Sequence, residues 1–542
     1  MSTVQRNMSL TGDASNYLNP TQKIATVIGM AGLAIMLLSV FNDFTNNSLW
    51  LTIALVSIVG GILLFTKGSY QGKLAGIKNH GVWFKSVSNR GFWGWIAGIS
   101  LTGFYVILYF YEGLLGLNEA GNTGLVGLFD PLSRFLSGNP ASQWFVYGTL
   151  YTVAILAFGI KFIWKYRHNK YEQLRTVSVM FFQTAFAFII PELMARLNSD
   201  DFSLPYNDLK NMWPLNYYAF DGWRVDQFIN AQTVGLVFLI FAILSVFVIS
   251  PILTYKYGKR WYCSWVCGCG GLAETAGDSF RHLSDKRMSA WKFERWMIHS
   301  VLVFSIVMTV AVVSTYLGYD PNKYWFTKNV FLLSVGVFLT LLFAGIAYYK
   351  RKELNKSAMR GAIGAYAITI GFLVFISFFN LNEIKINAAY FSFGLNDNVY
   401  SLDGSLRTFY GFGIGSIFSG VIGTGFYPIL GNRVWCRMGC PMAGILGIQQ
   451  RLFSKFRITT NGGQCISCGN CSTYCEMGID VRSYAQKGEN IVRASCVGCG
   501  ICSAVCPRGV LKLENGPLEG RIDGNDVLLG NDVDLMSLVN QK

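Results

Sequence analysis

Charged residues are scarce in this chain of 542 residues. Asp, Glu, Lys and Arg together make up 14% of the sequence, whereas soluble domains usually contain about 25%. Hydrophobic residues make up 52%, and the chain contains 41 phenylalanines and 14 tryptophans. This composition argues against an ordinary soluble enzyme and indicates a membrane protein.

Histidine is also rare, and cysteine is absent from the first 262 residues. None of the four histidines pairs with another at helical spacing on facing predicted helices, so we do not expect haem b. All thirteen cysteines lie between Cys263 and Cys506. Disulfide frameworks scatter cysteines through short secreted chains. This clustering instead indicates reduced thiolates that hold metal. The chain has no recognisable nucleotide or flavin motif, so we expect no direct NAD(P)H activity.

Ten stretches are long and apolar enough to cross a membrane, which requires ~20 mostly apolar residues. The predicted fold class is therefore an all-α polytopic bundle, with a tail at 1–22 and a transmembrane domain at 23–455. The first stretch is followed by no small-residue cleavage site, and we interpret it as a retained helix. The stretches are 23–41, 49–66, 92–111, 144–164, 177–194, 233–254, 296–316, 329–348, 361–379 and 408–429.

The loops between these stretches differ in charge. Lys and Arg concentrate after the second, fourth, sixth and eighth stretches, whereas acids dominate after the third, fifth and ninth. Cytoplasmic loops carry the excess of Lys and Arg. We therefore expect a multi-pass protein of the bacterial inner (cytoplasmic) membrane, with both termini and every cysteine motif cytoplasmic. The net charge of +15 follows from this topology, and we expect no nucleic-acid partner.

A short motif occurs twice. Gly258–Cys263 reads GKRWYC and Gly431–Cys436 reads GNRVWC, and each is followed four residues later by a second cysteine, Cys267 and Cys440. An even number of predicted helices separates the copies, so both emerge on the same face. The sequence therefore predicts a parallel internal repeat, with helices three to six matching helices seven to ten.

The strongest signal lies near the C-terminus. Two motifs have the bacterial ferredoxin spacing for [4Fe–4S] clusters, C-x2-C-x2-C-x3-C. The fourth ligand of each cluster comes from the other motif. The predicted ligands are Cys465, Cys468, Cys471 and Cys506 for one cluster, and Cys496, Cys499, Cys502 and Cys475 for the other. Two zinc ions are the alternative, but zinc sites usually pair C-x2-C units across a longer gap.

These motifs predict a small α+β two-cluster ferredoxin domain of βαββαβ type at 456–515. Pro507 ends the second motif as in bacterial ferredoxins, whereas Glu476 occupies the corresponding position of the first motif. An acidic tail follows at 516–542.

The two Cys-x3-Cys pairs predict a second thiol site. Residues i and i+4 lie on one face of a helix, so each pair should present two thiols side by side, and pseudo-symmetry would bring the four together. Such a soft site suits a third Fe–S cluster, zinc or copper(I). Redox-active disulfides and buried structural thiols remain alternatives. Cys269 has no counterpart in the second copy, and its role is open.

These motifs resemble the NapH/NosR/CcoG polyferredoxin family from about residue 260 to residue 513. The resemblance implies a membrane quinol dehydrogenase or electron conduit that serves extracytoplasmic nitrate or nitrous-oxide reductases, or copper reduction for oxidase assembly. The chain departs from the family in having Gly268 where the family has proline, in its ten predicted helices, and in lacking a large extracytoplasmic flavin-type domain.

Three functions follow from this reading. The first is a membrane-bound electron-transfer protein that links the quinone pool to [4Fe–4S] clusters and feeds an extracytoplasmic reductase or its maturation. The second is a copper-reducing or metal-relay assembly factor that acts through Cys263, Cys267, Cys436 and Cys440. The third is a scaffolding electron-relay subunit of a larger redox complex. Whether the chain is itself an enzyme stays open.

The first function requires a proton acceptor near the quinone. Ionisable residues inside a membrane are candidates, and the sequence offers Glu192 in the fifth stretch and His299 in the seventh. The predicted partners are membrane lipid, quinone and redox proteins. The aromatic residues of the outer loop 198–230 either form an interfacial belt or dock a partner.

Overall fold

The structure is a computed structural model that describes residues 18–72, 75–76, 90–197, 210–320, 322–350, 354, 356–381, 383–387, 399–517 and 519–523. Within those residues, nine helices are long and apolar enough to span a membrane. They are α2 (Pro20–Ser39), α3 (Asn47–Tyr70), α5 (Phe92–Phe110), α7 (Gln143–Lys165), the continuous α8–η2–α9 (Lys170–Leu197), the continuous α11–η3–α12 (Gln232–Tyr257), α15 (Met288–Tyr319), α16 (Lys328–Tyr349) and α17 (Lys356–Phe378).

The tenth predicted stretch is also a helix, but it is shifted toward the N-terminus. It begins as α18 (Leu402–Phe409) and continues as η6 (Tyr410–Ile422). Asp403 and Arg407 in its first two turns and several glycines in η6 make it less apolar than the other nine. A turn and the short α19 (Tyr427–Leu430) follow. Within the described residues, nine of the ten predicted stretches are therefore spans by length and apolarity, and the tenth is this less apolar helix.

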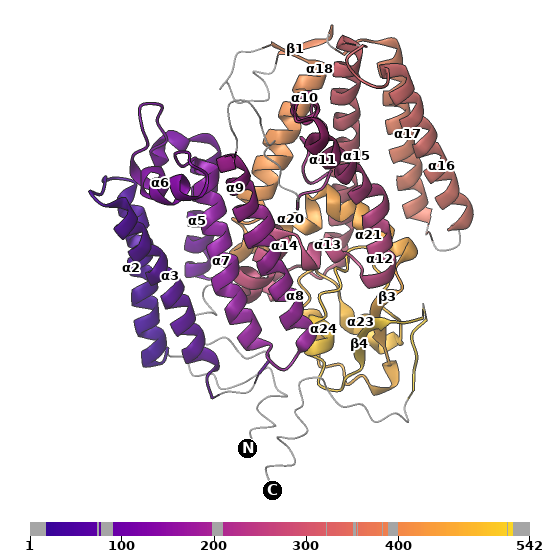
Figure 1. The fold of residues 1–542 in the computed structure, drawn as a ribbon. Helices are drawn as coiled ribbons and strands as arrows, with labels where there is room; N and C mark the ends of the chain where they lie inside the picture. Colours follow the sequence, from indigo (N-terminus) through magenta and orange to yellow (C-terminus); the bar gives the residue numbers. More distant parts are fainter. Residues whose placement is uncertain are drawn as a thin grey trace.

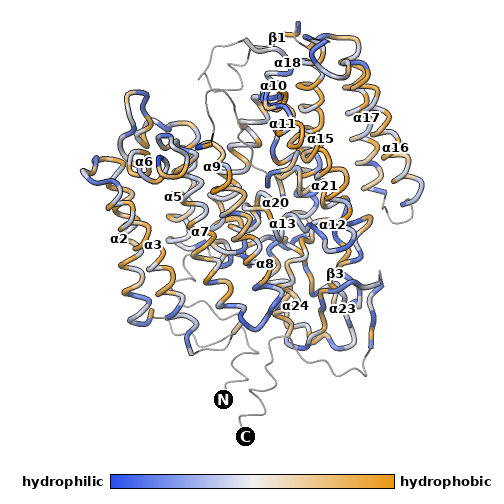
Figure 2. Tube along the Cα trace, in the orientation of Figure 1, coloured by the Kyte–Doolittle hydropathy of each residue, from blue (hydrophilic) through white to orange (hydrophobic). Residues whose placement is uncertain are grey.

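The ends of the helices that precede basic loops all point to one side. α3, α7, α12 and α16 end toward the side of the bundle where the C-terminal domain lies (Figure 1). The tube coloured by hydropathy shows orange along most of the long helices and more blue in the C-terminal domain and the loops (Figure 2). This arrangement agrees with the alternation of charge between successive loops.

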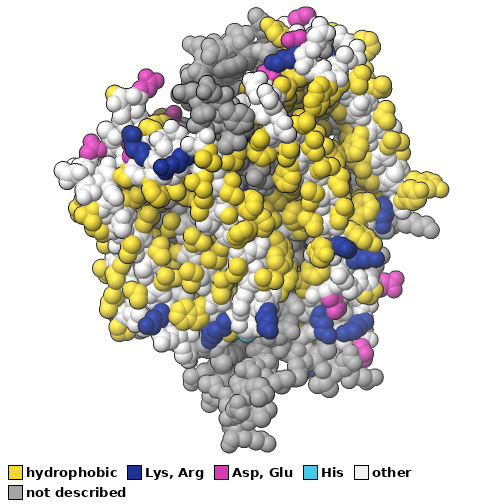
Figure 3. All heavy atoms as spheres, viewed as in Figure 1, with side chains coloured by type: hydrophobic (Ala, Val, Ile, Leu, Met, Phe, Trp, Pro, Cys, Tyr) yellow, Lys and Arg dark blue, Asp and Glu magenta, His cyan; other side chains and the backbone are white. Residues whose placement is uncertain are grey.

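Hydrophobic side chains gather in a wide band across the face shown in Figure 3, with Lys and Arg along its lower edge. The side chains of Leu333 and Leu341 on α16 are 69% and 68% exposed. Exposing apolar surface to water costs roughly 25 cal/mol per Å², and hydrocarbon removes that cost. The chain is therefore a multi-pass membrane protein, as its composition predicts.

The C-terminal domain has two strands in its sheet, fewer than the four of the predicted βαββαβ fold. β3 (Phe456–Thr460) pairs antiparallel with β4 (Leu511–Asn515), and short helices α22 (Asn470–Thr473), α23 (Val481–Lys487) and α24 (Ile501–Ala504) lie between them. Where the inner hairpin of a βαββαβ fold is expected, the described residues form α23 and one isolated bridge. The strand pattern is therefore simpler than predicted, because the segment between the two motifs folds as a helix.

The bundle and the C-terminal domain share one hydrophobic core. Buried residues of the membrane part, such as Cys263 and Met442, belong to the same packed cluster as Ile458 and Val497 of the domain. A continuous core fixes the domain against the bundle. This contact positions the functional site.

Candidate metal centre

Each Cys-x3-Cys pair spans the junction of two helices. Cys263 lies in the short α13 (Trp261–Trp265), and Cys267 is the N-cap of α14 (Gly268–Thr275). In the second copy, Cys436 lies in α20 (Val434–Met438), and Cys440 caps α21 (Pro441–Phe453).

The prediction that each pair lies on one helical face is therefore wrong. The second cysteine of each pair has extended backbone, with ψ of 124° and 113°. The chain turns at this residue and starts a new helix, at Gly268 in one copy and at Pro441 in the other. The two copies share this geometry, which agrees with an internal repeat.

Two arginines cross-link the two copies. Arg260 and Arg433 occupy the same position of the repeated motif. Arg260 Nη1 donates to the carbonyl oxygen of Cys436 at 3.3 Å, and Arg433 Nη1 donates to the carbonyl oxygen of Cys263 at 3.3 Å. Arg433 Nη1 also lies 3.9 Å from Cys436 Sγ. This reciprocal exchange brings the two motifs together in space.

The four thiols of this site are buried and influence one another. Their residues are 3–5% exposed. Burial and the nearby thiols raise the pKa of Cys263 and of Cys440. A hydrogen bond with the side chain of Cys269 is the main reason why the pKa of Cys267 is lowered to about 6. Cys269 is therefore a direct neighbour of Cys267.

Helix N-termini favour the ionised form of the capping cysteines. The backbone N–H of Ala443 donates to Cys440 Sγ at 3.4 Å, and backbone N–H groups of α14 act on Cys267 in the same sense. A helix N-terminus carries positive charge and lowers thiol pKa values. Four buried thiols do not all lose their protons on their own. Cysteine binds metal as the thiolate, so metal binding is the event that releases these protons. The donor set fits a thiolate-bound metal or cluster.

Gly268, which stands where the resembling family has proline, is closely packed. A Cβ at this position would lie 2.3 Å from Gln183 Oε1 and 3.1 Å from Lys210 Nζ. A larger residue would therefore have to displace the ends of these two buried side chains, which contact each other through a hydrogen bond of 3.0 Å.

Lys210 lies in the segment between α9 (Ile190–Leu197) and α10 (Gly222–Asn230), of which the structure describes residues 210–221. Its Lys210 carbonyl accepts a hydrogen bond from Tyr262 Oη at 2.8 Å, and Trp213 Nε1 donates to Thr309 Oγ1 at 2.9 Å. Trp213 therefore lies inside the bundle instead of in an interfacial belt. Tyr206 of the same loop lies outside the described residues.

The two ferredoxin motifs bring their cysteines together in the predicted sets. One small hollow is lined by Cys465, Cys468, Cys471 and Cys506. In the second set, Cys499, Cys496 and Cys475 lie near enough to Cys502 to interact with it electrostatically, as does Cys471 of the first set. Glycines with positive φ, Gly469 at 82° and Gly498 at 70°, allow the tight loops around each set. None of the thirteen cysteines, all of which the structure describes, forms a disulfide. These residues fit two [4Fe–4S] clusters, each with its fourth ligand from the other motif.

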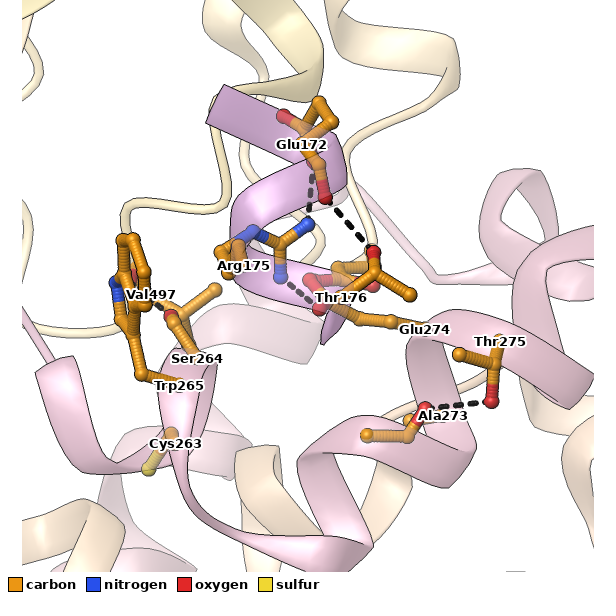
Figure 4. Close-up of polar contacts among 12 residues, drawn as sticks. Glu172, Arg175, Thr176, Cys263, Ser264, Trp265, Ala273, Glu274, Thr275 and Val497 are labelled. Atoms are coloured by element: carbon orange, nitrogen blue, oxygen red, sulfur yellow. Dashed lines mark hydrogen bonds and ion pairs between the residues drawn. The ribbon is translucent and has the colours of Figure 1, made fainter. Parts of the chain in front are cut away.

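The second ferredoxin motif lies directly on α13. Ser264 Oγ donates to the carbonyl oxygen of Val497 at 2.7 Å, and Figure 4 shows these two residues together, with Cys263 on the same helix. Tyr171 Oη donates to the carbonyl oxygen of Gly498 at 3.0 Å. The residue after Cys263 thus contacts the residue after Cys496.

A buried ion-pair network surrounds this junction. Glu476 accepts from Arg433 Nε at 2.6 Å and pairs with Arg281 Nη1 at 2.9 Å. Arg433 Nη2 also pairs with Glu274 Oε1 at 2.9 Å. Arg175 joins Glu274 to Glu172 (Figure 4). Burial alone would raise the pKa of Glu476, but the two arginines outweigh that effect and hold the pKa below its ordinary value.

Sequence reasoning did not anticipate this network. Two signals pointed to it, because Glu476 replaces a proline beside a predicted ligand and an arginine recurs in both copies of the repeat. The pairing partners Glu274 and Arg281 carry no local signature. They follow Cys267 by seven and fourteen residues.

A large open cavity of about 1900 Å³ lies beside the thiol site. Most of its walls are apolar side chains of α11, α15, α16 and α17, and its polar lining includes Arg260, Glu294 and His299. His299 Nδ1 lies 2.6 Å from the carbonyl oxygen of Arg295. Glu192, the other predicted proton acceptor, is half-buried in α9 and is not among the residues that line this cavity.

Comparisons with known proteins agree with this geometry. The family model of a 4Fe-4S dicluster domain matches residues 464–511. The model of a 4Fe-4S binding domain matches twice, at residues 239–287 and 412–459, and so confirms the internal repeat around the two Cys-x3-Cys pairs. No solved structure matches the chain.

One curated relative is the putative electron transport protein YccM of Escherichia coli (strain K12). It is 36% identical over 55 residues, which make up 10% of this chain and 15% of the relative. The match thus spans a small part of both proteins. The chain is an iron–sulfur protein that carries a dicluster domain and two copies of a 4Fe-4S binding domain on a multi-pass helical bundle.

Proposed function

We propose that this protein transfers electrons between quinone in the membrane and the [4Fe–4S] clusters of its ferredoxin domain, by way of the Cys-x3-Cys site. The observation that carries this proposal is the 2.7 Å hydrogen bond between Ser264 Oγ and the Val497 carbonyl oxygen. It joins the helix of Cys263 to the loop of Cys496. The partial match to a putative electron transport protein supports the same class of function.

The clusters, when bound, supply one-electron carriers whose potentials depend on their surroundings. The chain holds the second ferredoxin loop and the thiol site in fixed contact. The connection between them consists of covalent bonds from Cys263 to Ser264, one hydrogen bond, and covalent bonds from Val497 to Cys496. Arg260 supports the junction, because its Nε donates to Ala494 O at 3.1 Å and its Nη1 donates to Cys436 O at 3.3 Å.

We propose that the Cys-x3-Cys site holds a third [4Fe–4S] cluster. The same 4Fe-4S binding-domain model matches both copies of the pair, and Arg260 and Arg433 supply positive charge beside the thiols. A copper relay is less well supported, since it needs thiols that a partner can reach, and these residues are only 3–5% exposed beneath the ferredoxin domain.

Quinone is the proposed membrane-side substrate, and the cavity is its proposed site. A quinone has a long apolar tail and a polar head, and the cavity combines mostly apolar walls with polar groups that include Arg260 and His299. Arg260 contacts the Cys436 backbone, so a head group beside it would lie next to the thiol site. We propose His299 as the proton acceptor and leave Glu192 as the second candidate.

The family resemblance and the loop charges extend this proposal. The ferredoxin domain would lie in the cytoplasm of a bacterium and the opposite end of the bundle outside it, where a reductase or its maturation system would use the electrons. A scaffolding subunit of a larger redox complex would have the same clusters but would need stoichiometric partners for any activity.

Iron and sulfide analysis of anaerobically purified protein, combined with EPR before and after dithionite, tests the cluster content. We expect about twelve irons per chain, which corresponds to three [4Fe–4S] clusters. The variant Cys263→Ser/Cys436→Ser should retain about eight. About eight irons in both the wild type and the double variant would rule out the third cluster. Zinc in place of iron would rule out electron transfer altogether.

A further inference from the structure

The first ferredoxin motif is the part of the metal centre that reaches solvent. Cys468 is the one exposed cysteine of the thirteen, all of which the structure describes. Ile466, two residues before Cys468, is 57% exposed. Ser467, which lies between Ile466 and Cys468, has a φ of 59°. Because the second motif is docked on α13 through Val497, the first motif is the outer end of the chain of sites.

The surroundings of this loop are positively charged. The hollow formed by the first set of cysteines is also lined by Arg482 and Arg508, and among the residues that the structure describes no Asp or Glu lines it. Both arginines are exposed. Arg482 Nη1 lies 3.8 Å from the position of a Cβ on Gly469. Of the acids nearest in sequence, Asp480 accepts a hydrogen bond from Ser472 Oγ at 2.7 Å and Glu476 is buried against Arg433. Glu489, two residues beyond α23, and Glu514 on β4 are exposed.

We propose that this face, made of Ile466, Ser467, Cys468, Arg482 and Arg508 and named here the first-motif face, docks a small acidic one-electron carrier protein. The proposal rests on the proposed electron-transfer function and adds its soluble partner. One electron passes between the carrier and the first cluster, so that one is oxidised as the other is reduced. No bond is made or broken and no proton is transferred.

The chemistry of the face selects this kind of partner. One exposed apolar side chain and two arginines around the same hollow give a small, positively charged contact, and weak electron-transfer encounters bury less than about 1,200 Å². Complementary charge mainly accelerates the encounter and weakens at high ionic strength. A negatively charged carrier would therefore approach the exposed Cys468 directly.

The test uses full-length protein in lipid nanodiscs and a reduced flavodoxin of net negative charge as the probe. The variant Arg482→Glu/Arg508→Glu reverses two charges on the first-motif face. The control Lys455→Glu/Lys512→Glu makes the same change in net charge elsewhere on the domain, at two exposed lysines. Stopped-flow absorbance follows cluster reduction by flavodoxin across a series of salt concentrations, and dithionite serves as a small reductant that needs no docking.

We expect wild-type reduction by flavodoxin to slow steeply with salt. The face variant should react at least about tenfold more slowly at low salt and lose most of its salt dependence, while its rate with dithionite and its iron content stay unchanged. The control should stay within about twofold of the wild type. If charge reversal lowers the iron content, Arg482→Gln/Arg508→Gln replaces it, with a smaller decrease in the flavodoxin rate expected.

Three results would overturn the docking proposal. These are an unchanged rate in the face variant, an equal loss in the control variant, and a wild type that flavodoxin does not reduce although dithionite does. None of them bears on the iron content or on the reaction with quinone. Failure of the docking proposal is therefore distinguishable from failure of the proposed function.

Discussion

Replacing Arg433 with glutamine should change both the stability of the protein and the potential of its clusters. Arg433 contacts Cys436 Sγ, the Cys263 carbonyl, Glu476 and Glu274 at once. It is fully buried and has a φ of 57°, a left-handed conformation that is uncommon for residues other than glycine. A glutamine side chain is shorter and uncharged, and it cannot make these four contacts.

The stability cost follows from the two carboxylates. Removing one partner of a buried ion pair typically costs about 3–5 kcal/mol. Glu476 would keep Arg281 and Glu274 would keep Arg175. We therefore expect the loss in unfolding free energy to lie near the lower end of that range, at about 3 kcal/mol.

The effect on potential follows from the lost charge. Two unit charges about 4 Å apart interact by about 4 kcal/mol at an effective dielectric constant of 20, and charge spread over a cluster reduces this to roughly 2–4 kcal/mol. For a one-electron couple, about 1.4 kcal/mol corresponds to about 59 mV. Since a positive charge stabilises the reduced form, its removal should lower the midpoint potential by about 90–170 mV.

EPR-monitored redox titration and thermal unfolding in detergent measure the two effects separately. The matched control is Arg437→Gln, because Arg437 is also buried in α20 and pairs with Glu294 at 2.7 Å. Both variants should lose stability, but only Arg433→Gln should show the full shift in potential. Equal shifts in the two variants, or no shift in Arg433→Gln, would refute the assignment of Arg433 to the cluster environment.

Three further predictions concern the same junction. Glu476→Gln removes a negative charge next to Cys475 and should raise the midpoint potential of the second cluster in the same titration; a fall would contradict the sign. Ser264→Ala removes one buried hydrogen bond, at about 1–3 kcal/mol, and should slow electron exchange with quinone while the iron content stays constant. Gly268→Ala should cost about 1–3 kcal/mol in thermal unfolding through overpacking, whereas Gly103→Ala, whose added Cβ meets nothing within 4 Å, should be nearly neutral.

The long helices were predictable because hydrocarbon imposes a single requirement on every spanning segment. Length and apolarity alone located α3 and α16, and the spacing of Cys465 to Cys475 located the ferredoxin loops. These signals are local in sequence. They depend on few other residues of the chain.

The geometry of the thiol site was not predictable in the same way. An i, i+4 spacing suggests one helix, but Cys267 and Cys440 cap new helices, and hydrogen bonds of Arg260 and Arg433 hold the two turns together across the repeat. Lys210 lies beside Gly268 although it is more than fifty residues away in the sequence. A contact between such distant residues leaves no periodic pattern in the sequence.

The buried ion pairs of Glu476 illustrate the same limit. Its replacement of a proline was visible in the sequence, but its partner Arg281 precedes it by almost two hundred residues. Only the fold brings them together. A departure from a motif beside a ligand is therefore worth treating as a structural signal in its own right.

If electrons pass between the ferredoxin clusters and quinone through the Cys-x3-Cys site, removing that site should isolate the clusters from quinone. To measure this, dithionite-reduced protein, freed of excess dithionite, is mixed with a short-chain quinone, and the reduced-cluster EPR signals are followed by rapid freezing. We expect the signals to decay quickly in the wild type, more slowly in Ser264→Ala, and far more slowly in Cys263→Ser/Cys436→Ser, whose ferredoxin clusters remain. Equal decay in the wild type and in Cys263→Ser/Cys436→Ser would contradict this expectation, because quinone would then react with the ferredoxin clusters without using this site.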